Sequence, residues 1–361
     1  MIVKRITQRI IRAVLVGTII CIILVSYFSD LHAQTPANHN NSGTARVHSQ
    51  QSNRVATRNN FLTQLVASRQ SPVRPVDKFI TIYGQKIHYV EAGRGSVVIL
   101  IHGLGADLSQ WNNLIAPLSQ NYHVIALDQI GHGQSDRPFI NYRINTLVDF
   151  LEGFYKAMKI ERASLVGESL GGATATAFAH AYPQQVERLV LVDAGYGYAI
   201  PEASDPRLLG HQPGTLHLLG PSTRAQAKQL LELVTHNKQT LASEAAVDDL
   251  FASTMRAGYT IQKFIESFAR REDVLDNRLQ ALNLPTLIVW GRQDILSPLA
   301  LGERFNREIA NSQMVVIDNC GHAPPNECPR EFNLAVIRFL DGTNAKRRAA
   351  IARPTYLTRS Y

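Results

Sequence analysis

The sequence predicts an α/β fold in which a mostly parallel sheet is interrupted by an all-helical insertion. Short apolar runs alternate with helical patterns at 78–195, the alternation stops at about 196–283, and it resumes at 284–341. Continuous apolar runs suit strands that are buried on both faces of a parallel sheet. The two outer parts are therefore expected to form one core, into which the middle part is inserted.

Eight stretches of this core are expected to be strands. The first two, 79–83 and 87–91, are predicted to form a hairpin around Gly84 and Gln85. The other six are 96–101, 122–128, 163–167, 186–193, 286–290 and 313–317. Helices follow where apolar residues recur at i, i+3, i+4 and i+7. The expected helices include those at 111–118, 170–181, 299–310 and 330–340.

Residues 1–33 are predicted to be an export signal. Four cations precede an uncharged, largely apolar run at 13–29, which is the pattern of a charged n-region and an apolar h-region. The run is long for the h-region of a cleaved signal peptide and at the short limit for a membrane span. The alternatives are a signal peptide cleaved near Ala33 and an uncleaved signal-anchor. We expect the protein either to be anchored in a membrane through 13–29, facing the periplasm or cell exterior, or to be secreted.

The positive charge lies at the two ends of the chain. The net charge of the 361 residues is +8, of which 1–76 carry +8 and a basic C-terminal tail at 342–361 carries +5, so 77–341 carry −5. Binding of nucleic acid requires clustered cations on the folded domain, and we predict no nucleic-acid partner. Residues 34–77, polar over most of their length, are expected to be a flexible linker.

The segment Gly167-Glu168-Ser169-Leu170-Gly171 follows a predicted strand and precedes a helix of small residues. It matches G-x-S-x-G, in which a sharp turn lifts the serine hydroxyl to the top of the sheet. The two glycines leave room for a strained backbone, and the helix dipole favours an anion beside the serine. We predict that Ser169 is a nucleophile.

A serine nucleophile needs a general base. His322 is the best placed of the twelve histidines, because it follows the last predicted strand, where the loops of an α/β sheet converge. Asp294, after the preceding strand, is predicted to orient it. Asp193, at the end of the sixth strand, is the alternative acid. The segment from Asp128 to Ser135 is interpreted as a structural turn.

A serine hydrolase also needs two N–H donors for the oxyanion. Leu170, the residue after the nucleophile, is expected to supply one, and Leu104 in His102-Gly103-Leu104-Gly105 the other. Of the three cysteines, Cys320 and Cys328 either pair in an oxidising compartment or remain separate thiols. The sequence has no C-x-x-C motif, and we predict neither a metal nor a cofactor.

These motifs together resemble the α/β-hydrolase fold superfamily, in the serine-nucleophile subgroup with a helical cap after strand six. The resemblance covers about 78–341 and includes Gly291-Arg292…Asp294 and Gly321-His322-Ala323-Pro324…Glu327. It implies an eight-stranded sheet formed by 78–195 and 284–341, a cap at 196–283 and a Ser-His-Asp triad. Relatives that act on haloalkanes or epoxides carry Asp as the nucleophile, and Ser169 argues against both activities.

The sequence therefore predicts an exported or membrane-tethered serine hydrolase. Its expected substrate is a small carboxylic ester or related acyl compound, and a membrane tether would favour a lipidic one. A C–C bond hydrolase or a cofactor-free perhydrolase with the same triad is the alternative within enzymes. A ligand-binding protein without activity is the alternative from another class, and the complete set of motifs counts against it.

Overall fold

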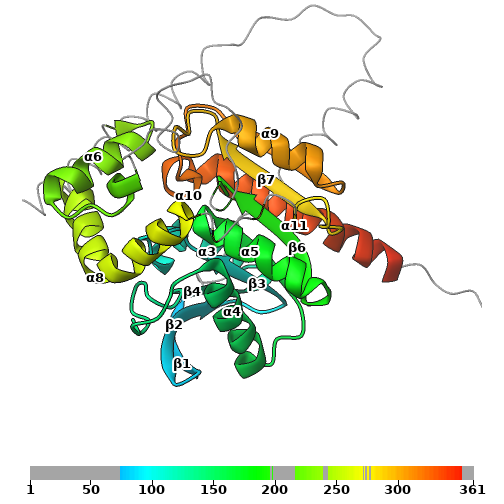
Figure 1. Ribbon diagram of the computed structural model, residues 1–361. Coiled ribbons are helices and arrows are strands. Elements are labelled where there is room, and N and C mark those ends of the chain that lie inside the picture. The colour runs from blue at the N-terminus through cyan, green and yellow to red at the C-terminus, as the bar shows by residue number, and fades with distance from the viewer. Residues whose placement is uncertain are drawn as a thin grey trace, which may run out of the picture. The chain divides into compact units, whose positions relative to one another are not determined.

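The computed structural model describes residues 74–195, 197, 216–238, 243–270, 272, 275 and 278–351 (Figure 1). The predicted export signal at 1–33, its apolar run at 13–29, most of the linker and the last ten residues of the tail lie outside the described residues. Within the described ranges, no helix combines the length and apolarity that are needed to cross a bilayer.

Eight strands form one sheet, as the sequence predicts. The order is β1-β2-β4-β3-β5-β6-β7-β8. Strand β2 is antiparallel to β1 and β4, and all other neighbours are parallel. The strands are β1 (Val76–Ile82), β2 (Gln85–Ala92), β3 (Ser96–Ile101), β4 (Tyr122–Leu127), β5 (Ala163–Glu168), β6 (Val186–Val192), β7 (Thr286–Gly291) and β8 (Ser312–Ile317).

The first hairpin turns one residue earlier than predicted. Ile82 pairs with Gln85, so that Tyr83 and Gly84 form a two-residue loop. Both have positive φ, 51° and 78°, as a type I′ turn requires. The glycine takes the second position of that turn without steric cost. The pairing also extends β1 back to Val76, into the last residues of the predicted linker.

Helices cover both faces of the sheet. The strand β3 shows why, because Ile99 and Ile101 belong to one buried cluster while Val98 and Leu100 belong to another. The first cluster includes side chains of α4, α5 and α9, and the second includes side chains of α3 and α11. These helices are α3 (Asn112–Leu118), α4 (Ile144–Met158), α5 (Leu170–Ala181), α9 (Leu299–Glu308) and α11 (Pro329–Ile351).

The last helix, α11, is longer than the sequence pattern indicated. It continues to Ile351, whereas the pattern predicted an end near residue 340. Apolar periodicity stops there, but Ala, Lys and Arg dominate the following residues, and these are strong helix formers. A helix can continue on propensity after its buried face has ended, and the first half of the predicted tail is therefore helical.

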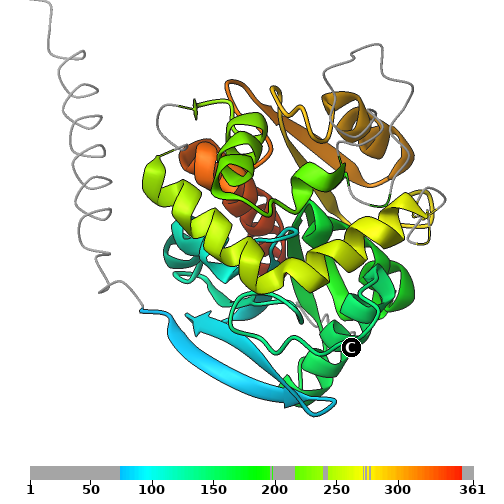
Figure 2. The ribbon, with the colours of Figure 1, turned by 60° about the vertical axis from the view of Figure 1, so that its left-hand side comes forward.

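Between β6 and β7 the regular elements among the described residues are all helices. They are η4 (Leu216–Leu219), α6 (Arg224–Val234) and α8 (Glu244–Ala269). The sequence determines the start of α6 locally: Thr223 Oγ1 accepts from the Gln226 N–H, and Gln226 Oε1 accepts from the Thr223 N–H, which is a capping box. Figure 2 shows α8 as the long yellow-green helix that lies across the α/β part.

Candidate active site

Ser169 lies at the sharp turn between β5 and α5. Its backbone has φ 49° and ψ −114°, a region that a non-glycine residue enters only under strain. A Cβ on Gly167 would overlap the carbonyl of Gly171, and one on Gly171 would overlap the carbonyl of Ile101. The close approach of these backbones explains why glycines flank the serine.

Both residues that are predicted to supply the oxyanion donors lie near Ser169. Leu170 is the first residue of α5, and an N–H in the first turn of a helix has no acceptor within the helix. Leu104, after β3, lines the same cavity as Ser169. Its neighbour Gly103 is so close that a Cβ there would lie 3.4 Å from the Ser169 Cβ. The 102–105 loop and the serine are thus adjacent.

Buried polar groups hold the 102–105 loop. Nε2 of His102 accepts from the Gln129 N–H at 3.0 Å, and the Gln129 side-chain amide donates to the His102 carbonyl at 2.7 Å. Because a backbone N–H can only donate, the ring proton of His102 is on Nδ1, which lies 2.7 Å from the Gly103 oxygen. Burial lowers the pKa of His102, which keeps it neutral in this structural role.

The segment from Asp128 to Ser135 is bonded to the residues that follow the 102–105 loop in the chain. The Asp128 carboxylate accepts from the N–H groups of Leu108 and Gln134, at 2.8 and 2.7 Å, and contacts His88 Nδ1 at 2.7 Å. Burial lowers the pKa of His132, inside the turn, to about 3. These contacts fit the structural turn that the sequence suggested.

His322 and Asp294 are in direct contact. Nδ1 of His322 lies 2.7 Å from Oδ2 of Asp294. The other carboxylate oxygen, Oδ1, accepts from the N–H groups of Leu296 and Ser297 at 2.8 and 2.9 Å. Both oxygens of the acid are therefore hydrogen-bonded, which fixes its orientation towards the imidazole.

Asp193, the alternative acid, lies close to His322 and Asp294, but its hydrogen bonds differ from those of Asp294. Polar atoms of Asp193, Asp294 and His322 lie within 4.8 Å of one another. Oδ1 of Asp193 accepts from the Gly291 N–H at 3.1 Å. Burial, and then the charge of Asp294, raise the pKa of Asp193 well above its usual range. A carboxyl group whose raised pKa favours the neutral form is poorly suited to stabilise an imidazolium, and Asp294 is the acid that bonds directly to His322.

A third carboxyl group, Glu168, was not singled out from the sequence. Its Oε1 lies 3.6 Å from Nε2 of His322. Burial raises the pKa of Glu168 to about 7, although the charge of His322 opposes the shift. Burial would lower the pKa of His322, but the charges of Asp294 and Glu168 overcome it and raise the value to about 9. The only sequence signal for Glu168 was its place directly before the serine.

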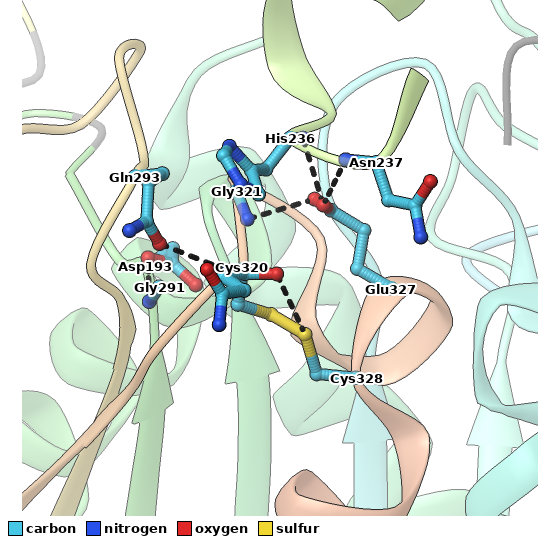
Figure 3. Close-up of a disulfide and its surroundings, with 10 residues drawn as sticks. Asp193, His236, Asn237, Gly291, Gln293, Cys320, Gly321, Glu327 and Cys328 are labelled. Atoms are coloured by element: carbon cyan, nitrogen blue, oxygen red, sulfur yellow. Dashed lines mark hydrogen bonds between the residues drawn. A yellow bond between two sulfur atoms is a disulfide. The ribbon is translucent and has the colours of Figure 1, made fainter. Parts of the chain in front are cut away.

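A disulfide and several hydrogen bonds fix the loop that carries His322 (Figure 3). Cys320 and Cys328 form a disulfide with 6.2 Å between their Cα atoms, so of the two alternatives for these cysteines the structure has the bridge. The Cys320 N–H donates to Gln293 Oε1 at 3.0 Å. Within the bridged loop, Glu327 Oε1 accepts from the Gly321 N–H at 3.0 Å.

The same loop is bonded to the end of α6. The His322 N–H donates to the Val234 carbonyl at 2.8 Å, and Oε2 of Glu327 accepts from the His236 N–H at 2.8 Å. Figure 3 shows Glu327 between Gly321 and His236. The C-terminal end of α6 and the His322 loop therefore form one hydrogen-bonded unit.

A cavity of about 470 Å³ contains Ser169 and His322 in its wall. Residues of the 102–105 loop line it beside the serine, and the helices between β6 and β7 line the other side. That other wall is mainly apolar, with Leu219, Leu230, Leu231, Leu250, Ile265 and Phe268. Among the described lining residues there are three acids, Asp107, Glu168 and Asp249, and no Lys or Arg.

Comparison with known families identifies the fold. Residues 96–325 match the model of the alpha/beta hydrolase fold family. The chain belongs to this family. The match spans β3 to the His322 loop and therefore includes every predicted catalytic and oxyanion residue.

The relatives of this alpha/beta hydrolase include C–C bond hydrolases and a phospholipase. The 2-hydroxy-6-oxo-6-(2'-aminophenyl)hexa-2,4-dienoic acid hydrolase of Metapseudomonas resinovorans is 31% identical, over 79% of this chain and 96% of that enzyme. A meta-cleavage product hydrolase from Pseudomonas fluorescens IP01 has a TM-score of 0.63 and 30% identity, covering 74% of this chain and 98% of that one. A membrane phospholipase A, a bacterial virulence factor, has a TM-score of 0.67 and 26% identity, covering 83% and 99%.

Proposed function

We propose that this hydrolase cleaves carboxylic esters with an apolar acyl or alcohol part. The observation that carries the proposal is the cavity that joins Ser169 and the hydrogen-bonded pair His322–Asp294 to an apolar wall. Ligand sites are mostly apolar clefts with a few convergent polar groups. The relationship to a membrane phospholipase A adds support for a lipidic ester.

The proposed reaction follows from the roles of these residues. Oγ of Ser169 attacks the ester carbonyl while Nε2 of His322 takes its proton, and Asp294 holds the imidazolium that forms. The N–H groups of Leu104 and Leu170 bind the oxyanion. His322 then gives the proton to the leaving alcohol, and an acyl group remains on Ser169. Water, activated by His322, hydrolyses this acyl-enzyme and restores the free serine.

Two of the relatives favour a second candidate, cleavage of a C–C bond in a dienoic acid. Such a substrate carries a carboxylate, which needs a positive partner when it is buried. The described wall of the cavity provides three acids and no Lys or Arg. A neutral ester fits this wall better than an anionic dienoate does, which is why we place ester cleavage first.

A substrate panel on the purified chain from residue 34 onward tests the proposal. We expect turnover of p-nitrophenyl esters of increasing chain length and no turnover of a 2-hydroxy-6-oxohexa-2,4-dienoate. Ser169→Ala, which removes the nucleophile and keeps the fold, is the matched control. Turnover of the dienoate alone would establish the C–C hydrolase. If a fluorophosphonate does not label Ser169 and no substrate is turned over, the ligand-binding alternative gains support.

The proposed location is a membrane or the space beyond it, because four cations precede the apolar run at 13–29. Alkaline phosphatase fused after Asn60 should be active in intact cells if the chain is exported. The mass of the mature protein then separates cleavage near Ala33 from an uncleaved anchor. An inactive fusion would place the enzyme in the cytoplasm.

A further inference from the structure

Glu168 is a buried carboxyl group that the proposed triad does not use. The residue is 4% exposed, and its Oε1 lies 3.6 Å from Nε2 of His322. Nε2 is the nitrogen that takes the proton of Ser169 in the proposed reaction. Two carboxyl groups therefore flank one imidazole, with Asp294 at Nδ1 and Glu168 beyond Nε2.

The side chain of Glu168 is held in this place by Gln110, which is itself bonded to the 102–105 loop. Gln110 hydrogen-bonds to the Glu168 carboxyl group and accepts from the Gly103 N–H through Oε1 at 3.2 Å. Since Oε1 is the acceptor in that bond, the NH₂ group of Gln110 is the donor to Glu168. A Cβ on Gly103 would overlap Oε2 of Glu168, so the glycine makes room for the carboxyl group.

We propose that Glu168 is a positioning residue that stabilises the imidazolium form of His322 from the Nε2 side and so sets the pH range in which His322 acts as a base. The role in catalysis rests on the proposed serine hydrolase mechanism. The electrostatic contact between Glu168 and His322 does not depend on which substrate is cleaved.

The charges around the two groups support this role. His322 faces Asp294, Glu168 and, at longer range, Glu327, all of which raise its pKa against the effect of burial. Asp193 lies nearby, but burial raises its pKa well above the usual range and so favours its neutral form. Glu168 itself senses the charges of His322 and Asp294. Because the described cavity wall contains no Lys or Arg, His322 is the cation there that Glu168 can stabilise.

Stabilisation of the imidazolium has opposite effects on the maximal rate and on the pH range of activity. An ionised Glu168 stabilises the imidazolium that forms in the transition state, which speeds the reaction once His322 is neutral. It also stabilises the imidazolium of the free enzyme, so that His322 becomes neutral only at a higher pH. Removing the charge should therefore lower the maximal rate and, at the same time, extend activity to lower pH.

The direct test is a titration of His322 without turnover. In a Ser169→Ala background, the hydrogen-bonded Nδ1 proton of His322 is followed by NMR as a function of pH, with and without Glu168→Gln. We expect the midpoint to fall by about one pH unit when the carboxylate is removed. Glu168→Asp, which keeps the charge at a greater distance, should restore part of the shift. Coincident midpoints in all three proteins would overturn the proposal.

The kinetic test uses the ester that the panel identifies. In Glu168→Gln the acid limb of the kcat/KM profile should move down by about one pH unit, the plateau should fall, and the two profiles should cross. A uniform loss with an unshifted limb would indicate a merely structural role and would contradict the proposal. Failure to find an ester substrate would leave the NMR result standing, so the two proposals fail separately.

Asp318→Asn is the matched control for loss of a single negative charge. Asp318 lies only four residues before His322 in the chain. Its side chain, however, is 68% exposed and forms an ion pair with Arg292. Solvent screens such a charge, so this variant should leave the His322 midpoint and the kcat/KM limb unchanged. An equal shift in Asp318→Asn would show that total charge, and not the buried contact, determines the effect.

Discussion

The two sides of the His322 ring differ in how their carboxyl groups are held. On the Nδ1 side, Asp294 bonds to the imidazole and to two backbone N–H groups. On the Nε2 side, Glu168 lies 3.6 Å away in a buried position that raises its pKa to about 7. Backbone donors after β7 thus fix the orientation of Asp294, whereas burial at the end of β5 gives Glu168 a charge that changes near neutral pH. The local environment, and not the residue type, separates the two roles.

The largest effect is expected on the Nδ1 side. Asp294→Asn should lower kcat/KM by about 10³- to 10⁴-fold, because an amide can neither hold the imidazolium nor fix the same tautomer of His322. Steady-state kinetics on the ester substrate would measure the loss.

Asp193→Asn is the comparison that makes this result specific. It removes a neighbouring acid whose raised pKa favours the neutral form, and we expect a loss of less than tenfold. If Asp193→Asn were the inactive variant and Asp294→Asn kept most of the activity, Asp193 would be the acid of the triad.

The combined effect of both sides should be visible in the wild-type pH profile. The pKa of His322 is raised to about 9, and a general base must be neutral to accept a proton. As pH falls below 9, kcat/KM should therefore drop about tenfold per unit, since the protonated fraction of the base grows. A profile that is already flat above pH 7 would show that the two carboxyl groups do not raise the basicity of His322.

For the disulfide that closes the loop of His322, the quantity measured is the free energy of unfolding. Cys328→Ser opens a bridge between residues that are eight apart, and the loss of chain constraint should lower the free energy of unfolding by about 2.5 kcal/mol. Denaturant unfolding measures it. Reductant should lower the stability of the wild type by a similar amount and leave Cys328→Ser unchanged; a reductant-sensitive variant would argue against this origin.

The smallest effect is expected from Glu327, which acts one step further from the ring. Glu327→Gln exchanges one carboxylate oxygen for an NH₂ group, so that either the Gly321 or the His236 N–H loses its acceptor. Charged hydrogen bonds contribute about 1.5 to 3 kcal/mol, but the bridge and the His322–Val234 bond remain. We expect a loss of kcat/KM below tenfold, measured at pH 9. A loss as large as that of Asp294→Asn would show that the loop cannot hold His322 without Glu327.

The fold could be predicted because its strands are buried on both faces. Runs such as 96–101 contain no polar residue after the first, and an apolar run this short favours a buried strand over a helix. Errors occurred where apolar burial does not decide the structure: Tyr83 and Gly84 form the turn through their backbone angles, and the end of α11 depends on helix propensity. Neither leaves a periodic apolar signal.

The site could be predicted as far as each residue has its own local motif. Ser169, Asp294 and His322 each follow a strand of the sheet, so the sequence could place all three at one edge. Contacts between distant segments left no such trace. The approach of Glu168 to His322 and the bond from His322 to Val234 depend on how loops and helices pack in three dimensions, and no spacing in the sequence reports it.

The bond between the His322 N–H and the Val234 carbonyl also restricts how a substrate can enter. If α6 moved away from the sheet, this bond and the Glu327–His236 bond would break, and the base would lose its backbone anchor. Access that leaves His322 in place must keep this edge closed. At the opposite edge, Ser253 Oγ of α8 donates to the Gly105 carbonyl at 2.8 Å, a side-chain contact that breaks without moving the base. A displacement of α8 from the 102–105 loop would therefore leave the backbone anchor of His322 intact, whereas a displacement of α6 would break it.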